Sequence, residues 1–138
     1  MSIVVGYLAT PEGRSALEAA ALEAQSRSTR LVVVTSCQKG RDERGRLAEE
    51  QELDEVRLDL DKRGIAHEIR LVASSRDVAE DLITAAEQND GSLIVIGLRR
   101  RSPVGKLILG ANAQRILLGA PCPVLAVKPA LVANMAME

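Results

Sequence analysis

Short, continuous runs of β-branched and aliphatic residues, separated by stretches of helical periodicity, constrain the fold of this chain most. Three of these runs, Ser2–Tyr7, Leu31–Thr35 and Ser92–Ile96, are apolar without alternation, as expected of strands that are buried on both faces. Strands that alternate with helices in this way specify a parallel sheet wound by right-handed crossovers. We therefore predict an α/β fold with a five-stranded parallel sheet and about four helices, in a single domain over residues 1–138.

Local signals place the remaining elements. Thr10, Pro11 and Glu12 supply an N-cap, a proline at the first helical position and an early acid, so a helix should begin there and end near Ser28. The alternation of Ile65–Val72 predicts a half-exposed strand at a sheet edge. The other expected elements are an amphipathic helix from about Arg46 to Arg63, which contains Leu47, Leu53, Val56, Leu58 and Leu60; a helix at Asp77–Asn89, with Val78, Leu82, Ile83 and Ala86 inward; a helix containing Asn112–Leu118; and a strand at Val124–Val127. Residues 130–138 are expected to form an arm or to be disordered.

Composition and charge exclude several classes of partner. The net charge is −1, from 18 basic and 19 acidic side chains, so no global field attracts nucleic acid or an anionic membrane. Tyr7 is the only aromatic residue, which argues against the stacking platforms that bind single-stranded nucleic acid. No apolar run approaches the ~18 residues of a membrane span, and the chain opens on a strand rather than on a signal peptide. We expect a cytoplasmic protein.

Few residues are available for catalysis or metal binding. Cys37 and Cys122 are expected to be free thiols, because they should lie at opposite ends of a parallel sheet. His67 is the only histidine, so neither a zinc site nor a histidine-based catalytic pair is easily assembled, and it is expected to be structural. The acids Asp42, Glu43, Glu49, Glu50 and Glu52 are expected on a loop and an exposed helix face, where they make no acid–base pair. The sequence predicts no catalytic residues and no metal site.

The last strand predicts a homodimer. Val124, Leu125, Ala126 and Val127 are apolar on both faces, although this strand should lie at the end of the sheet. An edge strand that resembles an interior strand is usually covered. We expect it to pair with the same strand of a second subunit across a two-fold axis.

The segment from Val95 to Pro129 carries the strongest functional signal. Gly97 directly follows an apolar strand, and a long loop then leads to the start of a helix near Gly110. Backbone N–H groups and the dipole at such a helix start form an anion site. Arg99, Arg100, Arg101 and Lys106 supply the loop with positive charge, which could pair with phosphate or with an acidic partner.

Two stretches of the chain resemble the universal stress protein family. They are IVVGYLATPEGRSAL near the start and IVIGLRRRSPVGKLILGANAQRILLGAPCPVLAVKP near the end. The resemblance covers essentially the whole chain and implies a Rossmann-like three-layer α/β sandwich. ATP-binding members have glycine, two residues, glycine, nine residues, glycine, then serine or threonine. Gly97 and Gly110 match the first and third glycines, whereas Arg100, Ala111 and Leu8 stand where those members have glycine, a hydroxyl residue and a ribose-binding aspartate.

These matches and departures define a candidate nucleotide or anion site. Its residues are Tyr7, Leu8, Ser36, Gly97, Arg99, Arg100, Lys106, Gly110, Ala111 and Asn112. The leading interpretation is a non-enzymatic, homodimeric stress-response factor with a degraded or retuned nucleotide pocket. One alternative is a true ATP binder with arginine-assisted phosphate contacts and slow hydrolysis. The other is a protein-interaction module that docks through the arginine loop. No cofactor is certain, and ATP or another adenine nucleotide is the candidate ligand.

Overall fold

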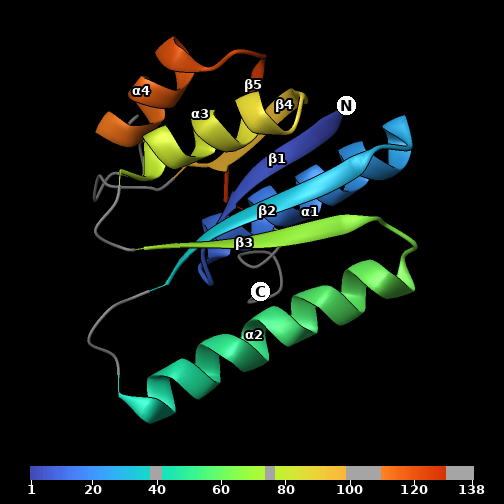
Figure 1. The fold of residues 1–138 in the computed structure, drawn as a ribbon, viewed down its shortest axis with the longest axis vertical. Helices are drawn as coiled ribbons and strands as arrows, with labels where there is room; N and C mark the ends of the chain where they lie inside the picture. The colour runs from blue at the N-terminus through green and yellow to red at the C-terminus, as the bar shows by residue number, and fades with distance from the viewer. Residues whose placement is uncertain (38–41, 74–76, 99–109, 130–138) are drawn as a thin grey trace, which may run out of the picture.

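The predicted parallel sheet is present in the computed structural model, which describes residues 1–37, 42–73, 77–98 and 110–129. The elements, in chain order, are β1 (Ser2–Tyr7), α1 (Pro11–Arg27), β2 (Arg30–Cys37), α2 (Glu43–Lys62), β3 (His67–Ala73), α3 (Val78–Gln88), β4 (Gly91–Gly97), α4 (Ala111–Gly119) and β5 (Val124–Val127). The five strands are parallel and lie in the order β3-β2-β1-β4-β5 (Figure 1). The α/β class and the strand composition of the sheet are therefore confirmed.

The sheet lies between two layers of helices. On one face, α1 and the second half of α2 pack against residues such as Ile3, Val5 and Leu31. On the other face, α3 and α4 cover Val4 and Ile94, and these two helices lie side by side (Figure 1). Because β1 is central, its successive side chains enter opposite cores, which explains why its sequence is apolar without alternation.

The helix starts follow their sequence signals. The Thr10 side chain accepts a hydrogen bond from the Gly13 N–H at 3.1 Å, so the predicted cap of α1 is confirmed. Helix α2 begins earlier than predicted, because the Asp42 side chain caps it by accepting from the Gly45 N–H at 2.8 Å. Asp77 caps α3 in the same way, accepting from the N–H groups of Ala79 and Glu80.

Three details of the predicted elements differ in the structure. The edge strand β3 begins at His67 rather than at Ile65, because the chain must first leave α2 through Gly64, whose φ is +69°. Only Val56 and Leu60 of α2 are buried, whereas Leu47 and Leu58 are exposed, since the helix packs on the sheet mainly through its second half. The expected inward position of Val78 is wrong as well, because it is the first residue of α3 and is exposed.

The carboxyl end of β4 packs tightly against the start of α1. A Cβ atom added to Gly97 would lie 2.3 Å from the carbonyl oxygen of Glu12, far inside van der Waals contact. We expect Gly97→Ala to lower the free energy of unfolding by about 1–3 kcal/mol or more, because backbone atoms must move. Urea unfolding measures the loss. Gly119→Ala is the control, since its Cβ would meet only the end of the Ile83 side chain at 3.0 Å. Equal midpoints for Gly97→Ala and the wild type would contradict this packing.

Candidate functional site

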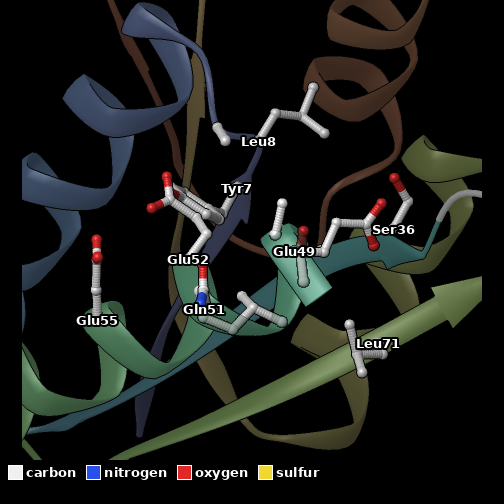
Figure 2. Close-up of a pocket in the computed structure, with 12 residues that line it drawn as sticks. Tyr7, Leu8, Ser36, Glu49, Gln51, Glu52, Glu55 and Leu71 are labelled. Carbon is white, nitrogen blue, oxygen red and sulfur yellow. The ribbon is translucent and has the colours of Figure 1, made fainter. Parts of the chain in front are cut away.

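A cavity of about 370 Å³ lies between the carboxyl ends of three strands and the middle of α2 (Figure 2). The sheet register explains its floor, because Tyr7 of β1 pairs with Thr35 of β2, and Thr35 pairs with Leu71 of β3. The lining residues are Tyr7, Leu8, Ala9, Thr35, Ser36, Ala48, Glu49, Gln51, Glu52, Leu53, Glu55 and Leu71. The carboxyl edge of a doubly wound sheet is where such folds hold their ligands.

The cavity combines apolar walls with polar groups. Leu8 and Leu71 line the cavity and are 43% and 56% exposed, whereas most leucine side chains are buried. Ser36 contributes a hydroxyl group, and in Figure 2 Glu49 lies on the same side of the cavity as Ser36. Apolar walls with a few polar groups are typical of sites for small organic molecules.

A hydrogen-bonded group of three side chains forms the wall near the end of β1. The Tyr7 O–H donates to Glu52 Oε1 at 2.9 Å, and Arg14 Nη2 donates to the same oxygen at 3.2 Å. Tyr7 and Glu52 also line a second groove of about 240 Å³ between α1 and α2. The group of three therefore separates the cavity from this groove and ties α2 to both β1 and α1.

The Tyr7 phenol is held in its neutral form. Burial, followed by the hydrogen bond to Glu52, raises its pKa from 10.0 to about 12. The folded protein thus keeps this proton at a pH at which the unfolded chain loses it. Stability should be unaffected below pH 10 and should decline as pH rises from about 10 to 12, by roughly 2–3 kcal/mol in total.

The phenolate absorbance measures this titration directly, because Tyr7 is the only tyrosine. We expect a midpoint well above 10 in the native protein, and a lower one in Glu52→Gln, which removes the carboxylate charge. The control is the urea-unfolded chain, which should titrate near 10. A native midpoint equal to the unfolded one would show that the Tyr7–Glu52 bond does not form.

The structure brings together some of the sequence-predicted site residues. Tyr7, Leu8 and Ser36 line the cavity. Gly97 ends β4 beside α1, and Gly110, Ala111 and Asn112 form the start of α4, where the Gly110 cap makes no side-chain hydrogen bond to the helix. The predicted residues Arg99, Arg100 and Lys106 lie outside the described residues, as does the 130–138 segment.

Sequence reasoning missed the contribution of α2. Glu52 was expected on an exposed face, and this is wrong, because its side chain is only 25% exposed and bonds to Tyr7. The reason is the position of Glu52 around the axis of α2. Glu52 precedes Leu53 and lies one turn before Val56, so it flanks the apolar stripe that packs on the sheet. That position relative to Leu53 and Val56 is the signal that could have placed it at the site.

Cys122 and His67 do not line the cavity. Cys122 is a free thiol, and burial raises its pKa. His67 lies at the amino end of β3, away from the cavity, and its Nδ1 is 2.9 Å from the Ile65 carbonyl oxygen. Within the described ranges no group of histidine, cysteine and acidic side chains could hold a metal ion. None of the helices in the described part of the chain is long and apolar enough to cross a membrane.

A doubly wound parallel sheet with a cavity at its carboxyl edge defines a Rossmann-like α/β protein. The model of the universal stress protein family matches residues 1–128. A universal stress protein of Mycolicibacterium smegmatis is 46% identical over 127 residues, which is 92% of this chain and 97% of the relative. The chain belongs to the universal stress protein family.

Solved structures agree with this assignment. A universal stress protein from Archaeoglobus fulgidus is 32% identical, with a TM-score of 0.75 over 93% of this chain and 98% of the other. A structure of the universal stress protein from the same organism in complex with dAMP is 28% identical, with a TM-score of 0.70 over 93% and 98% of the two chains.

Proposed function

We propose that this protein is a non-enzymatic, homodimeric stress-response factor whose cavity is a retuned adenine-nucleotide site. The observation that carries the proposal is the cavity at the carboxyl ends of β1, β2 and β3, with Leu8 on its wall. Its volume of about 370 Å³ falls in the range typical of small-molecule sites. The complex of a related universal stress protein with dAMP supports an adenine nucleotide as the ligand class.

The retuning rests on three positions. Leu8 cannot accept a hydrogen bond from a ribose, and it exposes its side chain to the cavity. Ala111 is the first residue of α4 and offers no hydroxyl to a phosphate. Arg100 stands where ATP-binding relatives have a glycine. A glycine there would allow the backbone to approach phosphate closely, whereas the long arginine side chain obstructs that approach. Each lost contact would weaken binding by about 1 kcal/mol or more.

The two edges of the sheet support a dimer through β5. The β3 edge carries Glu68 and Arg70, which form an ion pair, and charged side chains disfavour pairing with another strand. The β5 edge is entirely apolar, and its Leu125 is 38% exposed. Leu117 and Leu118 of α4 add exposed apolar surface, at 43% and 89%. This chain thus offers one edge that suits self-association and one that resists it.

The proposal is tested by the nucleotide content of the purified protein and by calorimetric titration with AMP and Mg-ATP. We expect no stoichiometric ATP after denaturation, weak binding of AMP, and no release of phosphate from ATP above the background rate. A stoichiometric ATP peak would instead support the arginine-assisted ATP binder. Failure of every adenine nucleotide to bind would favour an interaction module that docks through its arginine loop.

A further inference from the structure

We propose that Glu52 is a specificity-determining residue of this cavity, the acceptor that recognises the sugar hydroxyl groups of the bound nucleotide. The inference rests on the proposed function and deepens it. It assigns to α2 a contact that the end of β1 cannot make here, because the residue after Tyr7 is the apolar Leu8.

The position of Glu52 along the sheet edge supports a contact to the sugar. The strand order reverses between β1 and β4, since the chain winds outward to β3 on one side and to β5 on the other. In such sheets the phosphate lies at this switch point, near a helix start. The rest of the ligand must then run along the cavity from β1 towards Ser36 and Leu71 on β2 and β3. Glu52 meets Tyr7 at the end of β1, next to the switch point, where the sugar follows the phosphate.

The hydrogen bonding of Glu52 suits a ligand with hydroxyl groups. Both of its bonds within the described structure, from Tyr7 and Arg14, are made by Oε1, which leaves Oε2 as an acceptor. The side chain is 25% exposed and lines the cavity, so a ligand can reach it. An ionised carboxylate accepts strongly from hydroxyl groups and repels phosphate, which makes it selective for the sugar end of a nucleotide.

Tyr7 and Arg14 act as positioning residues. They fix Oε1 from two directions, at 2.9 and 3.2 Å, and the Arg14 charge offsets that of the carboxylate. The other two acids of the lining are placed differently. Glu49 lies on the Ser36 side of the cavity, and Glu55 lies further along α2, away from Leu8 (Figure 2). Glu52 is therefore the carboxylate that is held at the β1 end.

The test compares AMP with 2′,3′-dideoxy-AMP, which lacks both hydroxyl groups, by NMR titration of the full chain. The wild type should bind AMP roughly 10-fold or more tightly than the dideoxy compound, as expected for a charge-assisted hydrogen bond. In Glu52→Gln the preference should fall to about threefold or less. Glu50→Gln is the matched control, because it removes the same charge from an exposed position of α2 and should keep the wild-type preference.

The ratio of the two affinities separates recognition from a merely structural role. If Glu52 only ties α2 to β1, its substitution will weaken both ligands equally and leave the ratio unchanged, which would overturn the proposal. Glu52→Asp keeps the charge but withdraws the carboxylate by one methylene group, and a wild-type ratio in this variant would also contradict it. If the wild type binds AMP without preference over the dideoxy compound, the inference is wrong and the proposed nucleotide site stands. If the wild type binds neither, both are wrong.

Discussion

We expect the wild-type protein to be a dimer at micromolar concentrations and a Leu125→Lys variant to be monomeric under the same conditions. Leu125 is the second residue of the four-residue edge strand β5, and it is 38% exposed in the single chain. Pairing of two β5 strands would bury this side chain against the second subunit. A lysine there would place an unpaired ammonium group in an apolar interface, which costs several kcal/mol and should weaken association by roughly 100-fold or more.

Sedimentation equilibrium measures the association directly. Leu22→Lys provides the control, because Leu22 is 54% exposed on α1 rather than on β5, and its substitution should leave the dimer intact. The Leu125→Lys variant also tests the position of β5 in the sheet. Leu125 pairs in register with Val95 of β4, and the core beneath the two strands should be unchanged. A wild-type protein that sediments as a monomer at micromolar concentration would disprove the dimer.

The double substitution Arg100→Gly with Ala111→Ser is expected to raise the affinity for Mg-ATP by roughly 10- to 100-fold. The glycine would allow the backbone to approach phosphate, and the serine at the first position of α4 would add a hydroxyl donor next to the N–H groups of the helix start. A charge-assisted hydrogen bond to phosphate contributes about 1.5–3 kcal/mol, which corresponds to this range.

Calorimetric titration of the wild type and the double variant decides between the two roles of Arg100. Arg27→Ala is the control for loss of one positive charge. Arg27 is the last residue of α1, shortly before β2 begins, so it lies at the amino ends of the strands and away from the cavity. If Arg100 has become a phosphate anchor, the double variant will bind ATP more weakly than the wild type. Tight wild-type binding that collapses in the variant would therefore refute a retuned pocket in favour of the arginine-assisted ATP site.

Much of the site could be predicted because it follows directly from strand ends. Tyr7 and Ser36 lie at the carboxyl ends of parallel strands, and Leu8 directly follows one. The carboxyl ends of parallel strands meet at one edge of the sheet. The α2 side of the cavity could not be predicted in this way. The orientation of Glu52 depends on how α2 is rotated against the sheet, and a helix rich in both leucine and charge is compatible with several rotations.

The order and type of the elements, the parallel sheet and its apolar last strand can all be predicted from local sequence, because β-branched runs and helix caps act over a few residues. The packing of α2 through Val56 and Leu60, with Leu47 and Leu58 exposed, is seen only in the folded structure. The same holds for the contact of Glu52 with Tyr7 and Arg14, which lie 45 and 38 residues earlier in the chain. The physical reason is that a contact between distant segments depends on how they pack against a common sheet, and no local pattern of residues encodes that geometry.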